Sequence, residues 1–134
     1  KFKFDFTSDI PIIRSAEMYL IEAEAKVRLG KDAEAIELLF ELQKNRDSTA
    51  MNSGNTGQAL IEEILIERRK ELYGEIGVEW FDAKRLQRGI YRNGNHRIMN
   101  SADLQPNDKK FFLKIPQDEI DANIYIDESI NSNR

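Results

Sequence analysis

Three glutamates spaced one helical turn apart are the residues best suited to acid–base chemistry. Glu63, Glu67 and Glu71 share one face of a helix, because positions four apart lie one above the other. A glycosidase needs two carboxylates facing each other across a cleft, and a single helix face does not supply that arrangement. Arg68 and Arg69 lie within the same run. We therefore interpret the run as a structural ion-pair network.

The only histidine, His96, is the other candidate for proton transfer or metal binding. It lies between Asn95 and Arg97, and the sequence has no cysteine. A metal site or catalytic triad on His96 would need every other partner from carboxylates, so we interpret it as a solvated loop residue. Phosphate-binding loops, the serine nucleophile elbow and the zinc-protease helix are also missing. We expect no catalytic residue, no cofactor and no metal ligand in this chain.

Neighbouring aromatic residues could stack on a sugar ring. Trp80 and Phe81 are adjacent, and tryptophan offers a large aromatic face. Both lie in a helical pattern beside Leu86, which favours packing in a core over a binding platform. Tyr91 lies in a polar stretch and is predicted to be exposed. None of these residues is assigned to a ligand.

The hydrophobic pattern predicts a mainly helical fold. We expect helices over residues 16–29, 33–46, 56–73 and 78–88. The first is apolar or small around most of its circumference, so it should pack on more than one side. Gly30 should end it, and Asp32 should cap the next helix. The short connection predicts an antiparallel pair that resembles a tetratricopeptide hairpin, with further helices packed beside it.

Short extended segments are expected at both ends of the chain. Residues 1–6 alternate charged and aromatic side chains, as in a half-buried strand, and residues 123–134 are interpreted as a surface tail. Residues 90–110 are interpreted as a long exposed connection, and residues 117–121 as an acidic turn. We treat residues 1–134 as a single domain or fragment. Its start at Lys1, without a methionine, suggests missing upstream sequence.

Composition excludes several classes of protein. The 134 residues are 40% hydrophobic and 33% charged, which is typical of an ordered globular protein. The net charge of −4 disfavours a nucleic-acid partner. Without cysteine there is no disulfide framework. No apolar run approaches the roughly 18 residues of a membrane span, so the segment is expected to be soluble.

Three sequence blocks, taken together, resemble one known family. They are residues 13–25 (IRSAEMYLIEAEA) followed by Leu29 and Gly30, residues 66–72 (IERRKEL) and residues 80–86 (WFDAKRL). In content, order and spacing they resemble the carboxy-terminal region of the SusD/RagB family, surface lipoproteins of the Bacteroidetes outer membrane. Residues 113–116 (LKIP), with Glu119, Ile120 and Asn123, are similar to the closing segment of that family.

The resemblance implies a function for the whole protein. It implies a tetratricopeptide-containing protein that binds glycans or related nutrients without catalysis and acts as the lid of a SusC-like TonB-dependent transporter. Family members are held at the outer membrane by a lipidated cysteine, which lies outside these residues. The alternative is a tetratricopeptide module that binds a protein partner and has no carbohydrate role. A glycoside hydrolase fragment is a third hypothesis, which the missing acid pair disfavours.

The shared blocks also suggest roles for individual residues. Arg14, Glu67, Arg68 and Arg85 are interpreted as members of buried or semi-buried ion pairs that fix helix packing. Ligand contacts in the family vary and lie mostly upstream, so no residue here is assigned to ligand binding. The chain departs from the family pattern at Asn123, which is not followed by proline.

Overall fold

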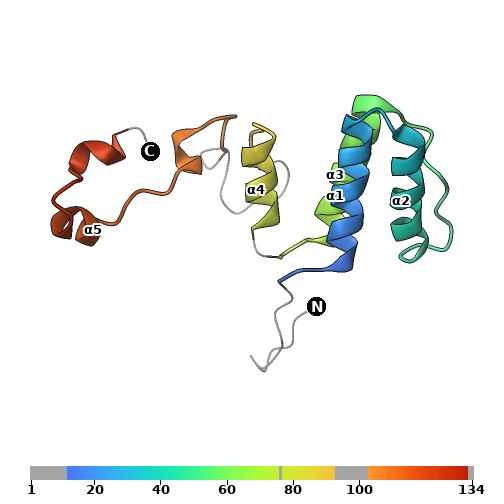
Figure 1. Cartoon of the computed structure of the whole chain (residues 1–134), viewed down its shortest axis with the longest axis horizontal. Helices are drawn as coiled ribbons and strands as arrows, with labels where there is room; N and C mark the ends of the chain where they lie inside the picture. Colours follow the sequence, from blue (N-terminus) through green and yellow to red (C-terminus); the bar gives the residue numbers. More distant parts are fainter. Residues whose placement is uncertain (1–11, 76, 93–102, 133–134) are drawn as a thin grey trace, which may run out of the picture. The chain divides into compact units, whose positions relative to one another are not determined.

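A computed structural model of the protein describes residues 12–75, 77–92 and 103–132 (Figure 1). The predicted strand at residues 1–6 lies outside this part. The described elements are the helices α1 (Ser15–Arg28), α2 (Asp32–Lys44), α3 (Gly57–Glu71), α4 (Val78–Arg85) and α5 (Gln117–Ala122), with 3-10 turns at Lys109–Phe111 and Glu128–Asn131. Contacts divide the chain into two units, Lys1–Val78 and Glu79–Arg134. The mainly helical fold is confirmed.

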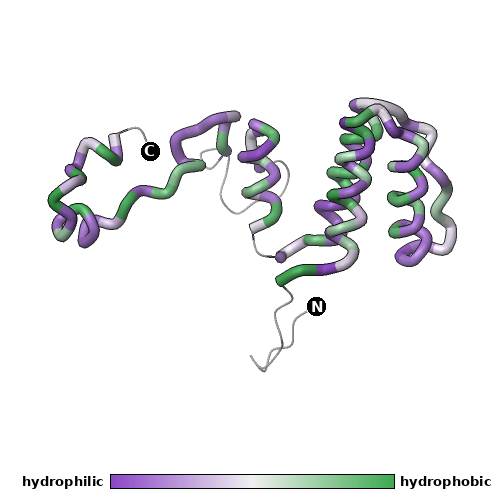
Figure 2. The backbone as a smooth tube through the Cα atoms, in the orientation of Figure 1, coloured by the Kyte–Doolittle hydropathy of each residue, from purple (hydrophilic) through white to green (hydrophobic). Residues whose placement is uncertain are grey.

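The first unit is a three-helix layer in which α1 packs against both α2 and α3. Hydrophobic and polar residues alternate along all three helices (Figure 2), and the apolar positions meet between them. The most deeply buried side chains are Leu20, Leu39, Leu60 and Ile64. Ala23 and Ala35 are fully buried, which lets α1 and α2 approach closely. The antiparallel, tetratricopeptide-like hairpin is therefore confirmed.

The helix ends of this unit lie within two residues of the predicted ones, but the predicted cap at Asp32 is wrong. Gly30 adopts the predicted left-handed backbone (φ 75°) after α1. Asp32 does not cap α2, because it is itself the first residue of that helix. Its carboxylate instead accepts a hydrogen bond of 2.8 Å from the backbone N–H of Gly57, the first residue of α3. Asp32 therefore satisfies a free N–H of α3 and links the starts of α2 and α3.

The second unit contains a small aromatic core. Ala83, Leu104 and Phe111 are buried, and Trp80 and Ile90 pack against them. Ile90 and Leu104 form an antiparallel bridge through two backbone hydrogen bonds of 2.9 Å. The prediction that residues 90–110 form an exposed connection is thus wrong for Ile90 and Leu104, whereas Tyr91 and residues 105–107 are exposed. Ile90 and Leu104 pack in the same core as Trp80.

Helix α4 ends earlier than predicted, and a different residue ends it. The helix stops at Arg85, and Gln87 takes the left-handed conformation (φ 51°) expected of Gly89. Gly89 meets a different constraint. A Cβ atom there would lie 2.6 Å from the carbonyl oxygen of Leu104 and 2.6 Å from the ring of Tyr91. Glycine is therefore required at position 89 by close backbone approach and not by its backbone angles.

The end of the chain is more ordered than the predicted tail. Residues 117–121, predicted as a turn, belong to α5. Glu128–Asn131 forms a 3-10 turn. The side chain of Asp127 caps this turn by accepting a hydrogen bond of 2.8 Å from the backbone N–H of Ser129. The amide of Asn131 accepts from the N–H of Ile115 and donates to its carbonyl. The side chain of Asn131 thus connects the terminal 3-10 turn to Ile115, a contact that the sequence pattern does not predict.

The two adjacent aromatic residues have different environments. Trp80 is half-buried, with its ring 4.9 Å from that of Phe111, whereas Phe81 is 63% exposed. The prediction of core packing is wrong for Phe81. The side chains of consecutive helical residues point about 100° apart. When Trp80 of α4 faces the core, the side chain of Phe81 therefore points away from it.

We expect Trp80→Ala to lower the free energy of unfolding by about 2 kcal/mol. This is less than the full loss for a completely buried aromatic, because Trp80 is only half-buried, although its ring packs at a tilt of 52° against the buried ring of Phe111. The matched control is Phe81→Ala, which should cost less than about 0.5 kcal/mol. Urea melts of both variants measure the difference. Equal effects would show that Trp80 lies outside the core.

Candidate functional site

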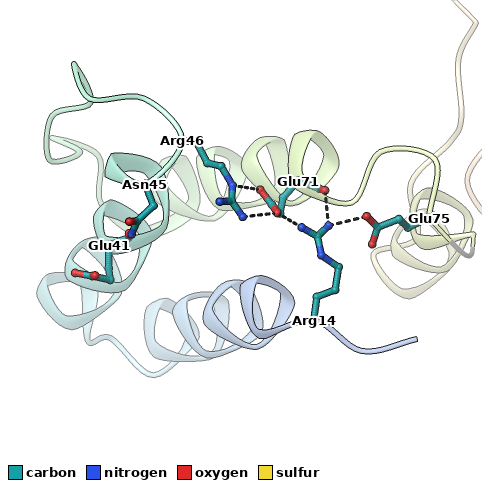
Figure 3. Close-up of polar contacts among 6 residues, drawn as sticks. All are labelled: Arg14, Glu41, Asn45, Arg46, Glu71 and Glu75. Atoms are coloured by element: carbon teal, nitrogen blue, oxygen red, sulfur yellow. Dashed lines mark hydrogen bonds and ion pairs between the residues drawn. The ribbon is translucent and has the colours of Figure 1, made fainter. Parts of the chain in front are cut away.

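The most extensive polar cluster in the first unit is centred on Glu71 (Figure 3). One carboxylate oxygen of Glu71 lies 2.5 Å from Arg14 Nη2 and 2.8 Å from Arg46 Nη2, and the other accepts from Arg46 Nε over 2.9 Å. Arg14 Nη1 also donates to the carbonyl oxygen of Glu71 over 3.1 Å and to Glu75 over 2.6 Å. We call Arg14, Arg46, Glu71 and Glu75 the Glu71 cluster.

Three helix ends bring this cluster together. Arg14 immediately precedes α1, Arg46 follows the end of α2, and Glu71 is the last residue of α3. The side chain of Glu71 is only 7% exposed, whereas those of Arg14 and Arg46 are 25% and 49% exposed. A buried carboxylate that pairs with guanidinium groups from the other two ends links all three ends, because each pairing stabilises its charge.

The electrostatics of the cluster suit a structural role. Hydrogen bonds from Arg46 are the main cause of the lowered pKa of Glu71, and the charges of Arg46 and Arg14 lower it further, against the opposing effect of burial. The same contact raises the pKa of Arg46. Glu71 is therefore ionised at neutral pH and hydrogen-bonded to both partners. A general acid needs the opposite, a carboxyl group whose pKa is raised toward neutrality.

The lowered pKa of Glu71 predicts a pH dependence of stability. Since the folded-state pKa lies below the unfolded value of about 4.3, the stabilisation is present above that value and is lost as pH falls through the folded pKa. We expect Glu71→Gln to be less stable than the unmodified chain at pH 7 and to lose less stability on acidification. Urea melts between pH 7 and pH 3 measure this. Parallel curves would contradict the described cluster.

Glu67 and Arg68, next to Glu71 on α3, are also buried, whereas Arg69 and Lys70 are exposed. Arg68 pairs with Glu17 of α1 over 2.8 Å, with its side chain 11% exposed. Glu67 accepts from Gln43 of α2 and from Lys70, each over 3.3 Å. The predicted burial of Arg14, Glu67 and Arg68 in helix-fixing contacts is confirmed. Glu71 pairs with Arg14, which precedes α1, and with Arg46, which follows α2, in addition to any contacts within the run.

Arg85 does not fit the predicted role. Its side chain is 45% exposed and bonds Asp82 of the same helix over 2.9 Å. The side chain of Asp82 is 19% exposed, and this pair lies within one helix, so by itself it does not join two helices. Tyr91 is 51% exposed, as predicted, and its hydroxyl lies 3.3 Å from Gln105. His96 lies outside the described residues.

An open hollow of about 310 Å³ lies beside the Glu71 cluster, between α1 and α2. It is lined by Ser15, Ala16, Tyr19, Glu41, Leu42, Asn45 and Arg46. Figure 3 shows Glu41 on α2 and Asn45 just after its end, on the side of Arg46 away from Arg14. Glu41 pairs with Lys44, and Arg46 pairs with Glu71. The charged side chains that line the hollow, Glu41 and Arg46, are therefore each paired with an opposite charge.

Sequence reasoning missed Arg46 and Glu75 as members of the cluster. Arg46 follows a helix in a polar stretch, and Glu75 follows Gly74 after the end of α3. The sequence around Arg46 and around Glu75 has no local pattern that predicts an ion pair with a distant residue. Among the four residues of the cluster, the sequence blocks indicate only Arg14 as part of an ion pair that fixes helix packing.

Metal binding finds no support in the described part of the chain, where no group of three or more His, Cys, Asp or Glu residues could hold an ion. None of the helices in residues 12–75, 77–92 and 103–132 is both long and apolar enough to span a bilayer.

These features define a helical scaffold, with a tetratricopeptide-like hairpin whose polar residues are used mainly in holding helices together. The model of the SusD family matches residues 6–131. The chain belongs to the SusD family. SusD-like protein P38 of Formosa agariphila is 36% identical over 91 residues, which cover 62% of this chain and 18% of that protein.

Solved structures share the fold. A SusD-like carbohydrate binding protein from Bacteroides vulgatus ATCC 8482 matches with a TM-score of 0.70 and 32% identity, covering 85% of this chain and 29% of that one. A second protein from the same strain matches with a TM-score of 0.72 and 33% identity, covering 85% of this chain and 27% of its own. The chain thus spans less than a third of the length of these relatives.

Proposed function

We propose that these residues form the carboxy-terminal portion of a protein that binds glycans or related nutrients at the cell surface. The observation that carries the proposal is the family match over residues 6–131, supported by the fold shared with a carbohydrate binding protein. The longer polypeptide would act as the lid of a SusC-like TonB-dependent transporter in the outer membrane. Its lipid anchor would lie outside these 134 residues, which contain no cysteine.

Within that protein, these residues would form a structural frame and would not contact the ligand. Arg14, Arg46 and Arg68 are engaged by carboxylates from other helices or helix ends. Side chains that fix packing in this way are poorly placed to change partners for a sugar, since each exchange would leave a buried charge with fewer hydrogen bonds. The oligosaccharide site is therefore proposed to lie in the rest of the polypeptide.

The proposed protein binds its ligand without cleaving it. Glu71 is held ionised by two arginines, and Glu67 is hydrogen-bonded to Gln43 and Lys70. We expect no glycan hydrolysis by the full-length protein. Chromatography of glycan digests would test this, with Glu67→Gln and Glu71→Gln as controls. Hydrolysis abolished by either substitution would overturn the non-catalytic role.

Affinity electrophoresis of the full-length protein tests the binding role. Migration through native gels that contain individual polysaccharides should be retarded by at least one of them, whereas a protein of similar size without sugar affinity should migrate unchanged. The alternative, a tetratricopeptide module with a protein partner, gains no support from the comparisons. It predicts unchanged migration in every polysaccharide gel, together with retention on a peptide ligand.

A further inference from the structure

One side chain joins the two ends of the last described segment of the second unit. The side-chain amide of Asn131 accepts a hydrogen bond of 2.9 Å from the N–H of Ile115 and donates one of 3.0 Å to the carbonyl oxygen of the same residue. In an antiparallel sheet, a residue of the neighbouring strand satisfies both backbone groups in this way. Asn131 therefore replaces a paired strand at Ile115 and closes residues 115–131 into a loop, which we call the terminal loop.

The helix inside the terminal loop is too short to be stable without support. Helix α5 has only six residues, and isolated helices shorter than about 12 residues are marginal in water. The other side-chain hydrogen bonds described in the loop, such as that from Asn123 to Glu119, join residues two to four positions apart. They shape local turns but do not join the two ends of the loop, so that role falls to Asn131.

The two ends of the terminal loop are anchored differently. Just upstream of the loop, the ring of Phe111 lies in the core of the second unit, 4.9 Å from that of Trp80. At the downstream end, the polar contacts with the upstream segment are those of Asn131 and a hydrogen bond of 3.2 Å from Lys109 Nζ to the carbonyl oxygen of Ser132. Hydrogen bonds exchange with water at small net cost, whereas a packed ring leaves its core only when that core opens. The downstream end is therefore the one that can detach.

We infer that residues 115–132 form a strap and that Asn131 is its clasp. When both hydrogen bonds between Asn131 and Ile115 break, the strap opens as one unit and α5 unfolds with it. Loop closure explains this cooperativity, because the residues between the two ends are restricted only while the loop is closed. The core around Trp80 stays packed, since Phe111 precedes the strap. Asn131 is thus a positioning residue for α5 and acts through Ile115.

Hydrogen exchange measured by mass spectrometry in the full-length protein tests this inference. In Asn131→Ala, peptides covering residues 115–126 should exchange at least about tenfold faster, because both bonds to Ile115 are lost. Peptides from α1 and α3 should be unchanged, which also establishes that the variant is folded. Ser132→Ala is the matched control, because the described contact of Ser132 with Lys109 uses its backbone carbonyl and should survive.

A second variant removes only one of the two hydrogen bonds. Asn131→Asp keeps an acceptor for the N–H of Ile115 but places a second carboxylate oxygen against its carbonyl oxygen, so exchange at pH 7 should again be faster. Faster exchange confined to residues 115–132 in both Asn131 variants supports the clasp. An unchanged rate in either variant overturns it, as does an equal effect of Ser132→Ala. Acceleration that extends to peptides containing Trp80 also overturns it, because the strap would then not open independently of the core.

Discussion

Replacing Leu20 with alanine is expected to lower the free energy of unfolding by about 3–5 kcal/mol, the range for emptying a buried leucine site. Leu20 is 1% exposed and lies in the same core as Leu39 on α2 and Leu60 on α3. Three helices surround the site, so collapse into the cavity would require all three to move. Urea unfolding monitored by circular dichroism measures the change.

Leu29→Ala is the matched control for this substitution. It removes the same atoms from the end of the same helix, at a side chain that is 75% exposed. In the 134-residue segment it should cost less than about 0.5 kcal/mol. A loss below about 1 kcal/mol for Leu20→Ala would show that the described core does not hold the three helices together.

Arg14→Ala is expected to cost about 2–4 kcal/mol. Removing one partner of a buried pair leaves a desolvated carboxylate with less compensation, and the side chain of Glu71 is only 7% exposed. The expected loss is reduced because Arg46 stays in place and because Arg14 is itself 25% exposed. Thermal and urea melts at pH 7 would measure it.

Two further variants separate geometry from charge. Arg14→Lys keeps the charge but has no planar fork, so it should recover only part of the stability that contacts with Glu71 and Glu75 provide. Lys44→Ala breaks the exposed pair with Glu41 and should cost less than about 0.5 kcal/mol. If Arg14→Ala were as mild as Lys44→Ala, the Glu71 cluster would not hold the helix ends.

The helices of the first unit could be predicted from sequence because their signals are local. Apolar residues recur with helical period, and Gly30 has the left-handed backbone that ends α1. The interactions of Asp32 and Glu71 could not be predicted in this way. Asp32 bonds a residue 25 positions away, and Glu71 bonds Arg14 from 57 positions away. Such pairings depend on how helices are arranged in space, which local spacing does not specify.

The second unit was predicted less well for a related reason. Its core joins Trp80 on α4 to Leu104, which lies in a stretch rich in polar residues, and to Phe111, which follows that stretch. An isolated apolar residue such as Leu104 has no periodic pattern around it, so the sequence indicates a loop there. The candidate ligand site could not be predicted at all, because the proposed function places it in sequence beyond these residues.

Isothermal titration of one glycan panel into the full-length protein and into the 134-residue segment tests the central claim most directly. The claim is that these residues supply a frame, while sugar contacts lie elsewhere in the polypeptide. A glycan that binds the full-length protein should bind the segment at least about a hundredfold more weakly, a difference of about 2.7 kcal/mol. Circular dichroism of the segment establishes that its helices are formed. Equal affinity of a folded segment and the full-length protein would place the sugar site within these residues and contradict the account.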